Sequence, residues 1–240
     1  MSQNLKFKKS ILQKYLNSIK KISDTAIVDV SESGLVSISS VEDCTLYLVS
    51  KLETDVDVDG ITLNLPSVSK LSKALDLISK DDCEFKLNSN NLEYKDNCVK
   101  FKYHLFDDGI LTKSKLSLNK ISTFKYDIEF DVATNFILQL LRNSNIFKDS
   151  TKLYLYTEND VLTWSLNDKT QSNTDTLTIN AQEVDFELDE FIFKLDNFKF
   201  LALQKDGIIK FKINSEIGIA NIEIQFGDIT LNYIANSLLK

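Results

Sequence analysis

The chain has 240 residues, of which 43% are apolar and 26% are charged, and its formal net charge is −7. These values lie near globular averages, so they exclude disorder or coiled coil for most of the chain and predict one large domain or two of ordinary size. No apolar run approaches the roughly 20 residues of a membrane span, and no apolar core of a secretory signal follows the first lysines. The three cysteines form no C-x-x-C pair, which predicts neither a disulfide framework nor a zinc site and suits a reducing cytoplasm.

The first half of the chain contains two predicted helices among short strands. Apolar residues recur with a 3.6-residue period from Phe7 to Ile22, which predicts an amphipathic helix over 7–22. Pro66 favours the first position of a second helix over 66–79, because its missing N–H has no helical partner there. Strand patterns are found at 26–30, 35–39, 45–52, 61–65, 83–88, 91–95 and 98–106. Residues 107–123 have no helical period and are predicted to be a linker.

The second half repeats this apolar pattern. A strand over 124–130 leads into a predicted helix over 131–147, with Asp131 as its N-cap. A shift of 126 residues places Ser33-Gly34 on Asn159-Asp160 and places Ile38 on Trp164, which favours a buried tryptophan. The implied unit is helix, four strands, helix and further strands, built twice. We therefore predict an α+β fold with one domain over 1–106, a connector over 107–123 and a second domain over 124–240.

Positive charge is concentrated in the predicted helices. The segments 5–22, 66–80, 131–148 and 194–205 hold 14 basic and 3 acidic residues among 63, whereas the other 177 residues hold 14 basic and 32 acidic. Lysine is a good helix former, but glutamate is equally good and is absent from 5–22, so propensity alone does not explain the pattern. A shared lysine-lined surface would instead bind a polyanion such as DNA through counterion release.

The basic residues are 27 lysines and a single arginine. Arginine suits bidentate reading of bases, whereas lysine acts as a point charge, so this ratio favours sequence-independent contact with a phosphate backbone. Codon bias in an AT-rich genome is the competing explanation of the ratio.

Three stretches resemble the DNA sliding clamps of T-even bacteriophages and their relatives, within the PCNA-like clamp superfamily of polymerase processivity factors. They are Leu5-Lys6-Phe7 with the following helix and the 26–39 hairpin, the segment 136–142, and the segment 191–200. Together with the repeat, the resemblance covers essentially the whole chain. The loop 165–176 and the tail 234–240 depart from the family pattern.

The resemblance implies two tandem clamp domains, each with two helices packed on antiparallel sheets, assembled head to tail as a homotrimeric ring. Helices would line a central hole that encircles duplex DNA without sequence preference. The DNA-binding candidates matched onto this sequence are Lys9, Lys14, Lys20, Lys21, Lys70, Lys73, Arg142 and Lys199.

The resemblance also implies protein partners, namely a DNA polymerase that the ring tethers and a clamp loader. A short peptide would dock in an apolar pocket near the connector, whose candidate residues are Ile110, Leu111, Leu116, Leu118 and Ile121. The alternative for these side chains is that they cover the sheet beneath them. No cofactor or membrane contact is implied, and the expected location is the cytoplasm, which is the host cytoplasm if the protein is viral.

The sequence carries no recognisable catalytic motif. His104, the single histidine, lies within an alternating strand pattern, and we expect it to be structural, without a metal. Phosphate-binding, nucleophile-elbow and dinucleotide motifs are absent, and the pairs Asp81-Asp82 and Asp107-Asp108 fall where aspartate caps or turns the chain. We therefore predict a protein that is not an enzyme. A β-rich viral structural or scaffold protein and a metal-dependent nuclease remain as alternatives.

Overall fold

The computed structural model describes residues 3–54, 56, 60–147, 150–167, 175–203 and 208–238. The chain divides into two compact units. The first unit comprises Met1–Ile121 with Gln225–Asn232, and the second comprises Ser122–Ile224 with Tyr233–Lys240.

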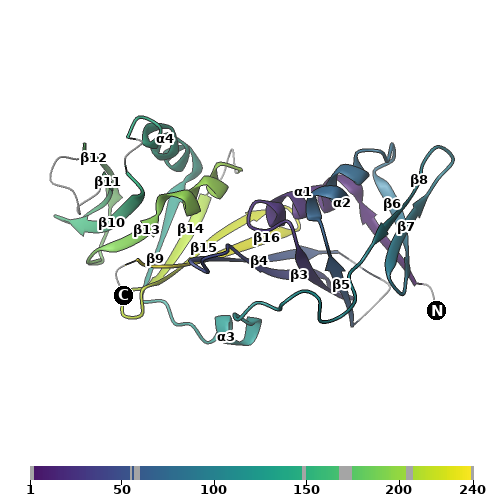
Figure 1. Ribbon diagram of the computed structural model, residues 1–240. Helices are drawn as coiled ribbons and strands as arrows, with labels where there is room; N and C mark the ends of the chain where they lie inside the picture. Colours follow the sequence, from purple (N-terminus) through teal and green to yellow (C-terminus); the bar gives the residue numbers. More distant parts are fainter. Residues whose placement is uncertain are drawn as a thin grey trace. The chain divides into compact units, whose positions relative to one another are not determined.

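The first unit contains two antiparallel sheets and a pair of helices (Figure 1). Its strands are β1 (Gln3–Lys8), β2 (Ala26–Ser31), β3 (Gly34–Ser40), β4 (Leu46–Glu53), β5 (Ile61–Leu65), β6 (Asp82–Asn88), β7 (Asn91–Lys95) and β8 (Lys100–His104). Its helices are α1 (Lys9–Lys20), α2 (Val68–Leu75) and the short α3 (Leu118–Ser122), whose last residue falls in the second unit. The strand orders are β1-β6-β7-β8 and β5-β2-β3-β4.

The second unit repeats the element order and the strand pairing of the first. Its strands are β9 (Ile128–Ala133), β10 (Lys152–Glu158), β11 (Val161–Asn167), β12 (Leu177–Glu183), β13 (Phe191–Lys194), β14 (Ile208–Asn214), β15 (Ile219–Phe226) and β16 (Ile229–Asn236). The end of β15 and the first half of β16, within Gln225–Asn232, fall in the first unit. Its helices are α4 (Thr134–Ser144) and the 3-10 helix η1 (Leu195–Leu203). The strand orders are β9-β14-β15-β16 and β13-β10-β11-β12, so α4 and η1 correspond to α1 and α2. The predicted α+β fold built from a repeated unit is confirmed.

Both turns that the repeat aligned contain a residue with positive φ, but only the second has two in succession. Gly34 has φ +130°, and Asn159 and Asp160 have φ +51° and +62°. Two consecutive positive φ values are typical of the type I′ hairpin turn, where Asn and Asp are tolerated best after Gly. A Cβ on Gly34 would lie 1.9 Å from the carbonyl oxygen of Leu52, so this position accepts glycine only.

Several predicted helix ends differ from the structure. The first helix begins at Lys9 because Phe7 and Lys8 belong to β1, which pairs with β6. The second helix begins at Val68, since Pro66 precedes the N-cap residue Ser67 rather than occupying the first turn. Asp131 is not an N-cap: it lies within β9, opposite Lys210, and Ala133 precedes α4. At the first and fourth helices, strand pairing takes residues that a helical periodicity alone assigns to the helix.

Each unit buries its own apolar core between helices and sheets. Tyr15 and Ile19 of α1 are fully buried in the first unit. In the second unit Trp164 is fully buried, as the repeat predicts, and contacts the rings of Phe136, Phe198 and Phe211 at centroid distances of 5.6–6.2 Å. No helix among the described residues is both long and apolar enough to span a bilayer.

Candidate nucleic-acid interface

Helices α1 and α2 pack side by side (Figure 1), and the faces that they do not bury carry lysines. Leu12, Tyr15, Leu16 and Ile19 of α1 are buried, as are Val68, Leu71 and Leu75 of α2. The remaining faces carry the exposed residues Lys14, Lys20, Lys21, Lys70 and Lys73, all of them predicted DNA contacts. We call these five side chains the lysine face.

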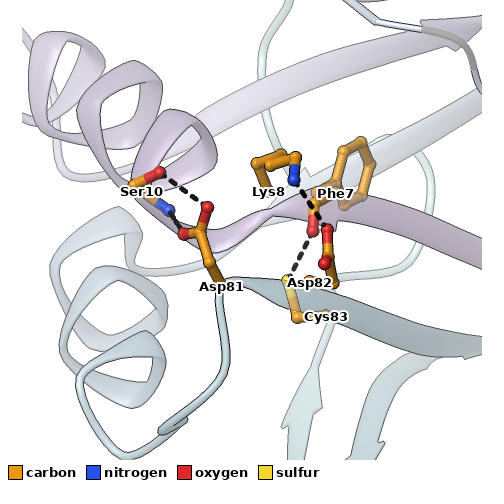
Figure 2. Close-up of polar contacts among 6 residues, drawn as sticks. All are labelled: Phe7, Lys8, Ser10, Asp81, Asp82 and Cys83. Atoms are coloured by element: carbon orange, nitrogen blue, oxygen red, sulfur yellow. Dashed lines mark hydrogen bonds and ion pairs between the residues drawn. The ribbon is translucent and has the colours of Figure 1, made fainter.

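Asp81 fixes the first turn of α1 from the segment that follows α2. The backbone N–H of Ser10 donates to Asp81 Oδ1 at 2.8 Å, and the Ser10 hydroxyl donates to Oδ2 at 3.2 Å (Figure 2). The backbone N–H of Lys9 donates to the Asp81 carbonyl at 2.6 Å. These hydrogen bonds, led by the backbone N–H of Ser10, hold the pKa of Asp81 below its usual value. Asp81 therefore supplies the cap that Lys8, the N-cap residue, cannot supply.

The two residues after Asp81 bind the strand that leads into α1 (Figure 2). Asp82 forms an ion pair with Lys8 at 3.0 Å, and the Cys83 thiol donates to the carbonyl of Phe7 at 3.2 Å. Burial raises the pKa of the Cys83 thiol to about 11, so this cysteine stays protonated and unreactive at neutral pH.

The first turn of α2 is held from two directions. Ser67 Oγ accepts from the N–H of Lys70 at 3.1 Å, while Asp24 accepts from the Ser67 hydroxyl at 2.9 Å and the Ser69 N–H at 2.7 Å. Burial of Asp24 acts to raise its pKa, but these hydrogen bonds outweigh burial and lower it. The Tyr103 hydroxyl donates to Ser67 O at 2.7 Å and accepts from Ser67 N–H at 3.0 Å. The lysine face is thus carried by helices whose ends are fixed to each other and to β8.

Lys9 differs from the other predicted DNA contacts. Its Nζ donates to the carbonyl of Ile78 at 2.8 Å in a partly buried position, just beyond the C-terminus of α2. A cation at that position compensates the negative end of the helix dipole. Its side chain therefore joins α1 to α2.

The second unit presents far less charge at the corresponding helices. Arg142 is exposed on α4, whereas Lys199 of η1 forms an ion pair with Asp196 at 2.5 Å. Asn135 and Gln139 are also exposed and stand at i and i+4 to one another, with Arg142 at i+7. Charge counting overlooked the two amides, although their helical spacing was visible in the sequence.

A cavity of about 310 Å³ lies between the connector and one sheet of the first unit. The connector contributes Leu116 and Leu118, and the sheet contributes Ile27, Val36 and Ile38. Lys113 and Asp29 also line it. The other connector candidates lie outside its lining: Ile110 is 57% exposed, and Leu111 and Ile121 are half-buried. The cavity can accept one or two apolar side chains of a peptide.

No cluster of three or more metal-ligating side chains occurs in the part of the chain that the structure describes. His104 is exposed on β8, and the three cysteines are free. The described surface thus presents two features: exposed ammonium groups on the helix pair α1 and α2, and a cavity with a partly apolar lining beside the connector.

No protein-family model and no curated protein matches the sequence. Solved structures do match across nearly the whole chain. A crystal structure of Proliferating Cellular Nuclear Antigen (PCNA) from Entamoeba histolytica matches with a TM-score of 0.75 and 16% identity, covering 98% of each chain. PCNA from A. fulgidus, bound to the C-terminal region of FEN-1, matches with a TM-score of 0.77 and 13% identity, covering 99% of each chain. The chain therefore has a PCNA-like clamp fold, with two tandem clamp domains.

Proposed function

We propose that this protein is a sliding clamp that encircles duplex DNA as a homotrimeric ring and tethers a replicative DNA polymerase. The single observation that carries the proposal is the lysine face on the helix pair of a complete clamp fold. Lysine contacts to phosphates are weak, solvated and independent of sequence, so they hold a duplex without stopping its movement.

Ring closure is supported by two different free sheet edges. β8 ends one sheet of the first unit, and β12 ends one sheet of the second. Every residue of β12 is exposed or half-buried, and the exposed positions Thr178, Asn180 and Gln182 are uncharged, with one charged residue, Glu183, at the end of the strand. Pairing of β8 with β12 of the next copy would be a head-to-tail contact, which closes into a ring when the rotation per subunit is suitable.

The connector cavity supports peptide-mediated tethering. Its apolar lining lies beside polar groups that can orient a backbone, which suits a short segment of a polymerase or clamp loader. Binding there would raise the effective concentration of the polymerase at the primer end. That a PCNA of the same fold binds the C-terminal region of FEN-1 is consistent with this mode.

The proposal includes a non-catalytic role. It also includes a bacteriophage-type setting in the host cytoplasm, for which the sequence resemblance to T-even clamps is the support. Tethering requires a ring closed around the duplex, a surface that contacts DNA and a surface that binds the polymerase. None of these needs a reactive group.

Sedimentation and imaging of the purified chain test the ring. The expected result is a trimer of about 82 kDa, given 27.4 kDa for one chain, with a hexagonal ring outline. Reversing charge at Lys20, Lys70 and Arg142 together to Glu should abolish polymerase stimulation while the trimer persists. A strictly monomeric chain at high micromolar concentration that stimulates no cognate polymerase would refute the proposal. Unchanged partner binding in the charge-reversed variant would instead favour a structural protein.

A second variant pair tests the cavity. Ile38→Glu puts a charge into the cavity lining, so it should remove polymerase stimulation and leave ring mass and DNA binding intact. Ile110→Glu, on the connector but outside the cavity lining, should retain stimulation. Equal effects of the two substitutions would contradict the assignment of the partner site to this cavity.

A further inference from the structure

The equivalent helices of the two units expose different chemistry. The lysine face of α1 and α2 has five ammonium groups. The corresponding exposed stripe of α4 has Asn135, Gln139 and Arg142, spaced i, i+4 and i+7, and residues 134–147 contain neither Asp nor Glu. Exposed protein surfaces commonly carry about a quarter to a third of charged residues of mixed sign. A helix face with amides and one arginine but no carboxylate is therefore unusual.

The stripe is held in a fixed orientation by the opposite face of α4. Ile137 and Leu140 are fully buried, and Phe136 contacts the buried Trp164 at a centroid distance of 6.2 Å. Rotation of α4 that would hide the amides would expose these side chains. Asn135 Oδ1 accepts from the Phe136 N–H at 2.8 Å, so the donors of this side chain are the two N–H bonds of its amide nitrogen.

The neighbouring helix adds no net charge to this stripe. Lys199 is paired with Asp196, so the described residues of η1 are electrically balanced. Arg142 is thus the cation of α4 that stands on its exposed face, and it is the single arginine of the chain.

Lysines and amides contribute to DNA binding in different ways. A lysine that neutralises a phosphate releases a condensed counterion, so its contribution falls as salt rises, with a slope of about −0.9 per phosphate in log K against log salt. An Asn or Gln amide donates hydrogen bonds to phosphate or sugar oxygens, directly or through water, and releases no counterion. Its contribution is therefore nearly independent of salt.

We propose that the two units grip the same duplex by different means: the first through the salt-dependent lysine face, the second through the neutral amide stripe of α4, with Arg142 as its single ionic contact. This inference rests on the proposed function and names how each unit recognises the phosphate backbone. Around a head-to-tail ring, ionic and neutral sectors would alternate. The long-range attraction of the ionic sectors centres the duplex, and the short-range amide contacts exchange with water as it moves.

Binding of the full chain to a fluorescent linear duplex tests the inference, with the association constant measured across about 50–200 mM salt. The first variant is Lys14→Ala/Lys70→Ala, the second is Asn135→Ala/Gln139→Ala, and Lys95→Ala and Asn4→Ala on β7 and β1 are the matched controls. Alanine is the best helix former, so neither helix variant should lose stability, which thermal unfolding verifies.

In a plot of log association constant against log salt concentration, the two variants should differ: one changes the slope, and the other shifts the whole line. The lysine variant should reduce the magnitude of the salt slope by about 0.9 for each phosphate that it no longer neutralises. The amide variant should lower the association constant about two- to tenfold by the same factor at every salt concentration, with the slope unchanged. Arg142→Ala should reduce the magnitude of the salt slope, whereas Arg142→Lys should leave the slope unchanged.

Two outcomes overturn the inference and leave the proposed function standing. In the first, the amide variant matches Asn4→Ala while wild type behaves as a trimeric, DNA-binding clamp. In the second, the amide variant changes the slope as a lysine variant does. A wild-type chain that neither forms a ring nor binds DNA in a salt-dependent way would overturn both.

Discussion

Replacement of Lys9 by Met separates a structural role from a DNA-binding role at one position. Lys9 lies among the lysines assigned to DNA by family resemblance, yet its Nζ donates to the carbonyl of Ile78 at 2.8 Å. Methionine keeps the length and apolar stem of the side chain and removes the charge and the donor. We expect Lys9→Met to destabilise the first unit and to leave the salt slope of DNA binding unchanged.

The size of the effect follows from the environment of this hydrogen bond. A charge-assisted bond to a carbonyl near a helix C-terminus contributes about 1–2 kcal/mol when partly buried. For a chain of this length such a loss lowers the midpoint of thermal unfolding by roughly 2–8 °C. Removing the Asp81 cap, which holds the first turn of the same helix, should lower the midpoint as well.

Thermal unfolding followed by circular dichroism measures the change, and duplex binding is measured on the same preparations. Lys14→Met is the matched control, because Lys14 is exposed on the same helix and should lose DNA affinity without losing stability. If Lys9→Met retains full stability and weakens DNA binding as Lys14→Met does, then the assignment of Lys9 to the helix pair is wrong.

Three further predictions concern the support of the lysine face. Tyr103→Phe removes both hydrogen bonds to Ser67 and should cost about 1–3 kcal/mol in urea unfolding; an unchanged midpoint would contradict this. Gly34→Ala should cost at least about 2 kcal/mol or prevent folding, whereas Gly60→Ala, which meets no atom within 4 Å, should cost about 1 kcal/mol. Since the pKa of Asp81 is lowered by folding, its stabilisation is complete above about pH 4 and is lost as pH falls further, so the stability gap to Asp81→Asn should close in acid.

Much of the fold follows from apolar periodicity. The repeated order of helices and strands could be predicted because each element buries one face, and the period of that face differs between helix and strand. Helix starts could not be predicted, because a helical period continues into an adjoining strand when both bury residues on one side. Phe7 illustrates this: it fits the period of α1 but lies in β1, opposite Cys83. The N-cap at Ser67 depends on Asp24 and Tyr103, which are distant in sequence.

The site was predicted less completely than the fold. Exposure of the lysine face followed from the helical wheel, because a lysine opposite an apolar stripe must face away from the core. The bond from Lys9 to Ile78 joins residues 69 positions apart, so no local pattern reveals it. The cavity uses Leu116 and Leu118 together with Ile27, Val36 and Ile38, and only the sheet register brings those three together. Local patterns predict which side chains leave the core, and tertiary pairing decides what they meet.

The charge of the chain is divided between its units as well as between helices and strands. The first unit holds 17 basic and 18 acidic residues, and the second holds 11 and 17. Five of the acidic residues of the second unit lie close together at 183–190, directly after the uncharged part of β12. In the first unit, Glu93 lies between Lys86 and Lys102 on the neighbouring strands. A hydrogen bond from Lys100 lowers the pKa of Glu93, so the negative charge of this carboxylate is compensated by lysines. A fold with two copies of one unit allows this division, because the proposed ionic contact with DNA needs a basic helix surface on one copy only.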